Sequence, residues 1–184
     1  DDAGRLGLSD HAFHFIGGIL RHARSITAVA NPLVNSYKRL LPNGLCPVLI
    51  AWSEENRSTM IRVPAQRGNE ARIILRSPDP TCNPYLVLAS AAEAGLNGIL
   101  EKTEPPPPVP EEGPEISILK QIVKKQGLPR SLNEALQALA DDKIIQDALG
   151  EHICRRFLAS KEAEWERFQA EVHQWELDEY QLNY

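Results

Sequence analysis

Apolar residues recur at helical spacing near the start of the chain, at Ala12, Ile16, Ile19, Ala23, Ile26 and Ala30. Ser9 precedes this run and is a residue type that caps helices. The pattern predicts one amphipathic helix over residues 10–30, which Asn31 and Pro32 end. Gly17 and Gly18 lie within it, and each costs roughly 1 kcal/mol relative to alanine in a helix. We therefore expect this glycine pair to admit the close approach of another element.

Three short runs rich in Ile, Val and Leu come next, at residues 48–52, 60–63 and 72–76. Polar turns separate them, which predicts a small antiparallel sheet. A second helix follows, with Asn83 and Pro84 in the favoured cap and first-turn positions and an end near Lys102. Its predicted buried stripe consists of Leu88, Ala92, Leu96 and Ile99.

The stretch "KTEPPPPVPEEGPE" favours extended polyproline II, as a spacer or as a connection along the surface. Beyond it the pattern is helical, with a capping box at Ser131–Glu134 and a short helix ended by Gly150. A long final helix is predicted from the stripe Phe157, Lys161, Trp165, Phe168, Val172 and Trp175. Its two tryptophans either form a ligand cage or pack in a core or interface, and the pattern favours packing. The fold class is therefore α+β, with short strands packed with helices and a C-terminal helical region.

Composition excludes several functions. The 184 residues carry a net charge of −5, which argues against nucleic acid as a partner, because such binding needs a surplus of basic contacts. No apolar run approaches the roughly 20 residues that span a bilayer, and no signal peptide is visible, so we expect a cytoplasmic protein without a membrane partner. Cys46, Cys82 and Cys154 lack disulfide or zinc spacing and are expected to be buried apolar residues.

Positive charge gathers in one part of this acidic chain. Between residues 20 and 75 the acidic residues are only Glu54, Glu55 and Glu70. The basic residues in the same window are more numerous, namely Arg21, Arg24, Lys38, Arg39, Arg57, Arg62, Arg67 and Arg72. Residues 101–184 are rich in acids. A local basic surface on an acidic protein indicates a site for a small anion.

Strand alternation in "ARIILRS" places Arg72, Ile74 and Arg76 on one face, with Ile73 and Leu75 on the other. Residues two apart on a strand are about 6.6 Å from each other. An acid at the middle position would have an attractive Coulomb energy of roughly 2.5 kcal/mol with each arginine at a dielectric of 20. Isoleucine carries no charge and makes no such interaction. Either the two arginines reach solvent over an apolar residue, or they hold an anion.

Seven blocks of sequence resemble, in order and at matching spacing, the C-terminal part of the catalytic domain of type I glutamine synthetase. They are "NPLVNSYKRLLP", "AWSEENRSTMIRVP", "RIILRSPD", "NPYLVLASAAEAGLNGI", "LPRSLNEAL", "LGEH" and "KEAEWERFQAEVHQWELDEY". The resemblance covers essentially the whole chain. It implies that residues 1–104 are a C-terminal part of the α+β catalytic domain, 105–114 a proline-rich connection, and 115–184 a helical subregion of the same domain.

The resemblance implies ATP-dependent ligation of glutamate and ammonia to glutamine through γ-glutamyl phosphate. By position, Arg39 and Arg76 resemble the residues that bind glutamate, and Arg57, Arg62 and Arg72 those that bind phosphate and ATP. Forked guanidinium groups suit both tasks, because they bind carboxylates and phosphates bidentately. The family uses ATP with Mg²⁺ or Mn²⁺ and assembles as a homo-oligomer of stacked rings, in which the chain's end, here "EYQLNY", reaches a neighbouring subunit.

Two departures from the family affect catalysis. Leu45 stands in "PNGLCP" where the family carries a glutamate that accepts a proton from ammonium. Ile74 stands where the family carries a glutamate that binds a metal, and isoleucine offers no oxygen ligand. We therefore predict no catalytic base, no metal ligand and no cofactor for this chain alone. The histidines of the chain are His11, His14, His22, His152 and His173. His11, His14 and His22 have no carboxylate at ligand spacing. We expect the five histidines to be exposed or to have their hydrogen bonds satisfied within the protein.

Three functional readings remain. The chain is a catalytically incomplete part of a glutamine synthetase, since nothing in it resembles the family's N-terminal domain or the first half of its catalytic domain. Alternatively, it is a non-catalytic relative that serves assembly or regulation, which the loss of both glutamates favours. A third reading is a family member with a rearranged site that acts on another amine.

Overall fold

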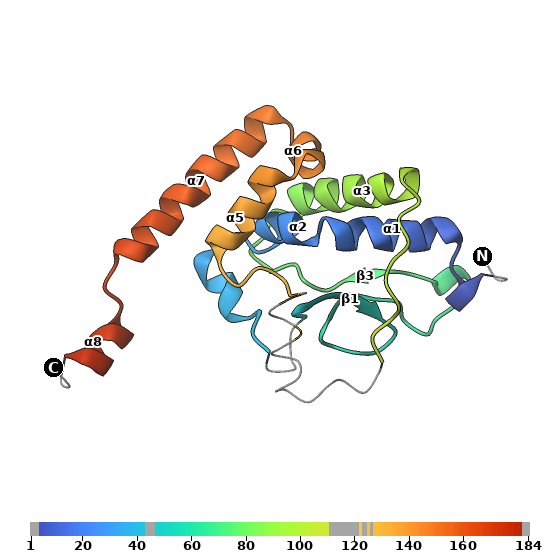
Figure 1. Ribbon diagram of the computed structural model, residues 1–184, viewed down its shortest axis with the longest axis horizontal. Helices are drawn as coiled ribbons and strands as arrows, with labels where there is room; N and C mark the ends of the chain where they lie inside the picture. Colours follow the sequence, from blue (N-terminus) through green and yellow to red (C-terminus); the bar gives the residue numbers. More distant parts are fainter. Residues whose placement is uncertain (1–3, 43–46, 111–121, 123–124, 126, 182–184) are drawn as a thin grey trace.

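The computed structural model of the chain describes residues 4–42, 47–110, 122, 125 and 127–181. Its strands are β1 (Leu49–Ser53), β2 (Thr59–Arg62) and β3 (Ile74–Leu75). The main helices before residue 110 are α1 (Asp10–Arg21), α2 (Ala23–Ala30) and α3 (Pro84–Leu100), with short 3-10 turns at Arg5–Gly7, Val34–Lys38 and Gly68–Glu70. Figure 1 shows α1, α2 and α3 lying over one face of the small sheet. The predicted α+β class is confirmed.

The sheet is mixed, so the prediction of wholly antiparallel strands is wrong for one pair. The strand order is β1-β2-β3, with β1 and β2 parallel and β2 and β3 antiparallel. The cause lies in residues 54–58, which carry the chain back along β1 before β2 begins. Asn56 Oδ1 accepts a hydrogen bond from Ser58 N at 2.9 Å, and the hydroxyls of Ser53 and Thr59 lie 2.8 Å apart. These hydrogen bonds stabilise the short connection, residues 54–58, between β1 and β2.

The predicted helix over residues 10–30 is two helices that meet at His22, where φ is −95° and ψ is 11°. The imidazole explains the break, because both of its nitrogens are bonded to distant elements. Nδ1 lies 2.7 Å from Asp142 Oδ2, and Nε2 lies 3.1 Å from Asn97 Oδ1. These contacts draw the chain at His22 toward α3 and the C-terminal helices.

The glycines of α1 confirm the expected close approach, and the partner is α3. A Cβ on Gly18 would lie 2.1 Å from the carbonyl oxygen of Ala94 and 2.7 Å from the nitrogen of Gly98. A Cβ on Gly17 would lie 2.1 Å from the carbonyl oxygen of Thr103. Only glycine permits these distances, so α1 and α3 touch backbone to backbone.

The prediction of which face of α3 is buried is wrong. Leu88 is 68% exposed and Leu96 is 50% exposed, while Ala92 is also exposed. The residues that α3 buries are Val87, Ser90, Ala94, Gly95 and Gly98. Contact with the glycines of α1 requires small residues at the crossing, and the leucines consequently turn outward. The predicted caps are confirmed, since Asn83 Oδ1 accepts from Tyr85 N and Ser9 Oγ accepts from Ala12 N.

The proline-rich segment follows the sheet as far as the structure describes it. Trp52 Nε1 donates to the carbonyl of Pro106 at 2.7 Å, and Val109 N donates to the carbonyl of Trp52 at 2.9 Å. Asn56 Nδ2 donates to the carbonyl of Pro110 at 2.8 Å. Residues 106–110 therefore run beside β1 as a connection along the surface. The rest of the predicted connection, residues 111–114, lies outside the described residues.

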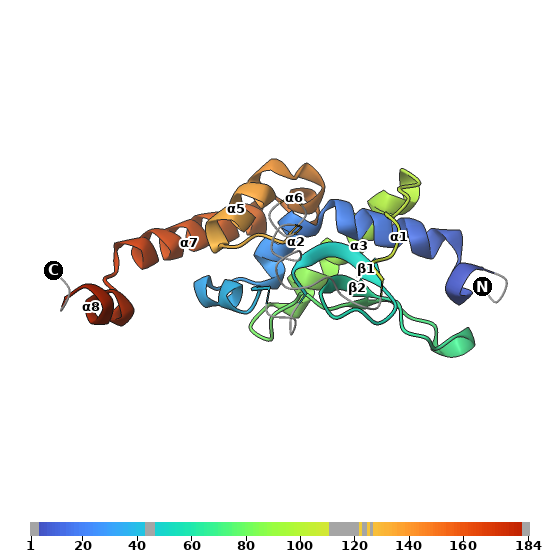
Figure 2. The same ribbon diagram turned by 60° about the horizontal axis from the view of Figure 1, so that its bottom comes forward.

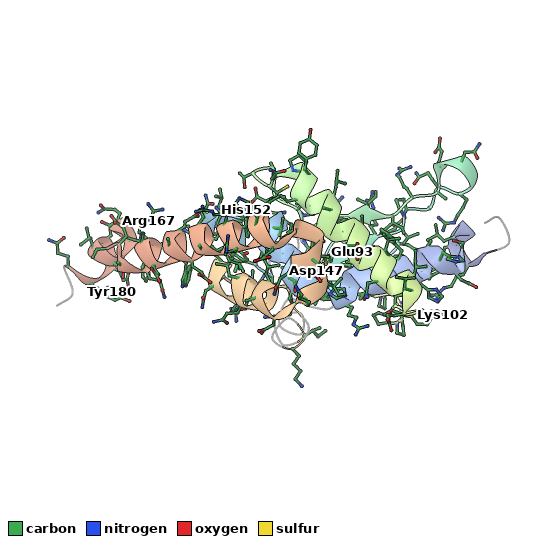
Figure 3. All side chains as sticks on the ribbon, turned by 90° about the horizontal axis from the view of Figure 1, so that it is seen from above. Glu93, Lys102, Asp147, His152, Arg167 and Tyr180 are labelled. Carbon is green, nitrogen blue, oxygen red and sulfur yellow. The ribbon has the colours of Figure 1, made fainter. Side chains whose placement is uncertain are left out.

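Between residues 127 and 181 the structure describes four helices: α5 (Leu132–Asp141), α6 (Lys143–Leu149), α7 (Glu151–Ala170) and α8 (Gln174–Tyr180). Helix α5 packs on α2 and α6 packs on α3, as the view in Figure 3 shows with Glu93 on α3 near Asp147 on α6. The capping prediction is confirmed at Ser131, whose hydroxyl accepts from Glu134 N. The glutamate side chain, however, accepts from Arg130 N, one residue before the cap.

The predicted final helix ends early, because α7 stops at Ala170 and a new helix, α8, begins at Gln174. Glu176 Oε2 accepts from His173 N at 2.8 Å, which caps the start of α8. Trp165 stacks on Phe168, which confirms packing for that residue, but Trp175 is 64% exposed. Figures 1 and 2 show α7 and α8 extending away from the rest of the molecule.

The prediction that the cysteines are buried has a mixed outcome. Cys154 is buried as expected, Cys82 is only partly buried, and Cys46 lies outside the described residues.

None of the helices in the described part of the chain combines the length and the apolar character that a membrane span requires.

The buried pair of His22 and Asp142 makes stability depend on pH. The hydrogen bond with Asp142 raises the pKa of His22 above its usual 6.5. Burial alone would raise the pKa of Asp142, but the hydrogen bonds from His22 and Ser25, the charge of His22 and the backbone hydrogen bond from Ile145 together outweigh burial and hold that pKa below 3.8. The contribution of His22 is complete below pH 6.5 and is lost as pH rises through its folded pKa, while that of Asp142 is lost as pH falls below 3.8. The pair therefore stabilises the fold most between these two values.

We predict that His22→Gln lowers the free energy of unfolding more at pH 5 than at pH 9, because at pH 5 the parent holds a charged imidazolium against Asp142, and this charge is lost as pH rises through the raised pKa of His22. Urea denaturation at the two pH values measures the difference. The exposed His11→Gln serves as the matched control and should show no such dependence. An equal loss at both pH values for His22→Gln would contradict the assignment.

Candidate functional site

Strand β3 divides its side chains between two faces, as its alternation predicts. Ile73 and Leu75 pack against the helical core. Ile74 pairs across the sheet with Arg62 of β2, so these two side chains share the face turned away from the helices. Arg72 and Arg76, two residues to either side of Ile74, belong to the same face. We call Arg62, Arg72 and Arg76, together with Ile74 between them, the arginine face; Figure 2 brings this side of the molecule forward.

Arg76 ties the arginine face to the loop between β1 and β2. Its Nη1 donates to the carbonyl of Arg57 and lies 3.4 Å from the carbonyl of Thr59. The side chain of Arg57 is exposed. Four of the five arginines singled out in the sequence therefore come from segments that meet at β2 and β3.

Arg39, the fifth arginine, is anchored where the chain leaves β3. Its Nη2 donates to Asn31 Oδ1 at 2.8 Å and to the carbonyl of Ser77 at 2.6 Å. Both Asn31 and Ser77 are fully buried. Sequence reasoning missed this pair, since it treated Asn31 only as a helix end. No spacing signal marks it, because one contact spans 38 residues and uses a backbone carbonyl.

Several buried polar atoms around Arg39 have no hydrogen-bond partner within the described structure: Arg39 Nε, Asn31 Nδ2 and Ser77 Oγ. Arg62 Nε, on the arginine face, is also buried without a hydrogen-bond partner among the described residues. An unsatisfied buried polar group costs on the order of 1–3 kcal/mol, and each such atom in a native structure asks for an explanation. Three of these four atoms are N–H donors, which an anion or a water molecule would satisfy.

The carboxylate nearest in sequence to this group is Asp79. Burial raises its pKa, but the hydrogen bonds from the backbone and hydroxyl of Thr81, each 2.8 Å from Asp79 Oδ1, together with a hydrogen bond from Ser36 and the positive charge of Arg39, outweigh that effect. The net pKa lies below 3.8, so Asp79 is ionised at neutral pH.

Acids do not neutralise the whole basic region. Arg67 forms an ion pair with Glu54 at 3.2 Å. Arg62 and Arg72, in contrast, take part in none of the ion pairs found among the described residues. Two guanidinium groups on one strand pair therefore keep their charge available, and the chemistry they can perform is to hold a carboxylate or phosphate.

The described residues do not fit a divalent metal. No group of three or more His, Cys, Asp or Glu side chains in this part of the chain could hold a metal ion, and Ile74 contributes no oxygen to the arginine face. Leu45, the other departure noted in the sequence, lies outside the described residues. His14 and His22 are satisfied by Glu104 and Asp142 at 2.9 and 2.7 Å, carboxylates that are distant in sequence, while His11 and His152 are exposed.

The chain is similar to known proteins along nearly its whole length. The profile of the family described as "Glutamine synthetase, catalytic domain" matches residues 1–180. Glutamine synthetases of Thermus thermophilus and Thermotoga maritima are 51% and 48% identical over 178 and 176 residues. These alignments cover 96% and 95% of this chain but only 40% of each relative. The chain thus spans about 40% of the length of the curated relatives it matches.

Solved structures agree in fold. The structure titled "Apo GmaS without ligand" has a TM-score of 0.81 at 35% identity and covers 98% of this chain and 40% of its own. The structure titled "GmaS/ADP complex-Conformation 1" has a TM-score of 0.81 at 33% identity, over 96% of this chain and 41% of its own.

We predict that sulfate raises the melting temperature by binding at the arginine face. At ten times its Kd, a ligand stabilises the folded state by about 1.4 kcal/mol. Differential scanning fluorimetry against equal ionic strengths of chloride measures the shift. The double variant Arg62→Met/Arg72→Met should lose it, whereas Arg155→Ala, an exposed arginine of α7, should keep it. Equal shifts in both variants would show that sulfate acts on the protein generally and that the face is not a site.

Proposed function

Because this chain belongs to the glutamine synthetase family and corresponds to a C-terminal part of its catalytic domain, we propose that it supplies the anion-binding arginines of an ATP-dependent glutamate–ammonia ligase. In this reaction ATP phosphorylates the side-chain carboxylate of glutamate, and ammonia then displaces the phosphate. Both substrates present anionic groups, and the observation that carries the proposal is the set of arginines gathered around β3.

Each arginine has a proposed partner. Arg39 and Arg76 bind glutamate, and Arg57, Arg62 and Arg72 bind the phosphates of ATP. The anchoring of Arg39 by Asn31 and Ser77 supports its part, because a guanidinium with one nitrogen fixed has lost much of its conformational freedom before a carboxylate arrives. For the nucleotide, support comes from the similar protein whose structure is titled as an ADP complex.

On its own, the chain is proposed to be catalytically incomplete. It spans about 40% of the length of its curated relatives, and Ile74 gives the arginine face a hydrocarbon where the family strand has a carboxylate. The family's Mg²⁺ or Mn²⁺ therefore has no role assigned to residues of this chain. The partners proposed are glutamate, ATP, ammonia and other glutamine synthetase-type subunits, in the cytoplasm.

A second candidate is a non-catalytic relative that serves assembly or regulation. The position of Ile74 favours it, since the side chain lies directly opposite Arg62. A carboxylate lost from the centre of an arginine cluster is a change that a working ligase of this family would not be expected to tolerate.

A chimera tests whether the arginines of this chain support the ligase reaction once both glutamates are restored. In the Thermus thermophilus relative, the segment that matches this chain is replaced by this chain, and glutamine formation is measured with ATP, magnesium, glutamate and ammonium. We predict that the chimera loses activity by at least 10²-fold, because a positioned general base alone is worth about 10²–10⁴-fold. The same chimera with Leu45→Glu and Ile74→Glu should recover activity, and adding Arg39→Ala should abolish it again.

The isolated chain is the control and should form no glutamine above a heat-killed sample. Full activity of the unmodified chimera would contradict the role given to Leu45 and Ile74. A folded double-glutamate chimera that stays inactive would contradict the ligase proposal and favour the non-catalytic candidate.

A further inference from the structure

Arg39 is held by two oxygen atoms that carry no net charge. Its Nη2 donates to the side-chain amide oxygen of Asn31 at 2.8 Å and to the backbone carbonyl of Ser77 at 2.6 Å. Asn31 and Ser77 are both fully buried. The two bonds use both hydrogens of Nη2, so one nitrogen of the guanidinium group is fixed before a ligand arrives. The donors on Nη1 and Nε are used by neither anchor.

The backbone that carries the two anchors is also held in place. Asn31 directly follows α2, and its N–H donates to the carbonyl of Thr27 at 2.8 Å. The carbonyl of Ala30, one residue earlier, accepts a hydrogen bond from Asp79 N at 2.7 Å. This bond joins the end of α2 to the segment that contains Ser77. The anchors of Arg39 therefore belong to a rigid part of the fold, which positions a side chain more accurately than a mobile loop would.

This anchoring leaves the charge of Arg39 available. Arg39 takes part in none of the ion pairs found among the described residues. The positive charge of Arg39 contributes to the low pKa of Asp79, but Asp79 Oδ1 accepts its hydrogen bonds from Thr81. The substitution Asn31→Asp would keep the shape and the acceptor oxygen of residue 31, but it would place a negative charge against the guanidinium group. A neutral anchor thus fixes the direction of Arg39 without compensating its charge.

We propose that Asn31 is a positioning residue for the carboxylate site at Arg39, and that its neutral amide is what the site requires. It holds the guanidinium group in the direction from which a carboxylate is bound, and it does not compete with that carboxylate for the charge. Pre-ordering a side chain in this way lowers the entropy lost on binding. The inference rests on the proposed function in one respect, because the carboxylate is that of glutamate only if Arg39 has the role given to it above.

Nuclear magnetic resonance of the isolated chain tests the anchoring without any substrate. In a mobile guanidinium group, rotation exchanges the two Nη nitrogens, whereas hydrogen bonds to one of them slow this exchange. We expect the exchange at Arg39 to be at least about fivefold faster in Asn31→Ala than in the parent, because one hydrogen bond is lost. It should stay slow in Asn31→Asp, which keeps the acceptor. The matched control is Ser90→Ala, which removes a different buried polar atom, on α3, and should leave the exchange rate unchanged.

Kinetics of the double-glutamate chimera described above test the need for a neutral amide. We expect Asn31→Ala to raise the KM for glutamate about fivefold, with kcat and the KM for ATP unchanged, because it removes only the pre-ordering of Arg39. Asn31→Asp should raise the KM for glutamate at least about tenfold even though Arg39 stays anchored, because the added carboxylate competes with glutamate for the guanidinium group. A purely structural role for Asn31 would instead leave Asn31→Asp, which has nearly the same size, with the KM of the parent. Ser90→Ala should keep the kinetic constants of the parent.

The outcomes separate this inference from the proposed function. Equal exchange rates at Arg39 in the parent and in Asn31→Ala would overturn the anchoring, and a parental KM for glutamate in Asn31→Asp would overturn the need for a neutral amide. If circular dichroism shows that Asn31→Ala is unfolded, the comparison of the parent with Asn31→Asp decides the inference. A double-glutamate chimera that is inactive before any change at Asn31 contradicts the proposed function, and the exchange rates in the isolated chain then decide the anchoring by themselves.

Discussion

The backbone contact between α1 and α3 determines the arrangement of the helical layer. A Cβ on Gly98 would lie 2.2 Å from the carbonyl oxygen of His14 and 2.6 Å from Cα of Gly18, so neither helix tolerates a side chain at the crossing. Small residues of α3 consequently face α1, and its leucines face outward. The same packing holds α3 beside β3 and leaves an apolar groove between them. One steric requirement thus accounts for both the compact core and the exposed apolar surface of this chain.

Strand β3 connects that helical layer to the chemistry on the other side of the sheet. Because side chains alternate along the strand, those of Ile73 and Leu75 point toward the groove. Those of Arg72, Ile74 and Arg76 lie on the arginine face. Arg39, held by Asn31 and Ser77, extends the basic region to the segment that follows the strand. Within the cluster, Ile74 occupies the position where a carboxylate would interact with the most arginines. Among the described residues, no acid forms an ion pair with Arg62 or Arg72.

Local signals in the sequence predicted much of this, and long-range contacts account for what they missed. Caps at Ser9, Asn83 and Ser131, the glycine contact of α1 and the alternation of β3 depend on neighbouring residues or on backbone sterics. The break at His22 depends instead on Asp142, 120 residues away. The exposed face of α3 was missed because hydrophobicity predicts burial, whereas here the glycine crossing decides which face is buried. The family resemblance supplied roles for the arginines, but the anchoring of Arg39 becomes visible only in three dimensions.

Ile74 lies beside Arg62 and Arg72, which form no ion pair with any acid among the described residues. A comparison of Ile74→Glu with Ile74→Gln probes this charge, because the two side chains have nearly the same size and differ in charge. Free energies of unfolding are measured by urea denaturation at pH 7, at about 20 mM and 1 M salt, where the Debye length falls from tens of ångströms to roughly 3 Å. We predict that the glutamate variant is more stable than the glutamine variant by about 1 kcal/mol at low salt, and that the difference shrinks at high salt. Equal stability of the two variants at both salt concentrations would contradict it.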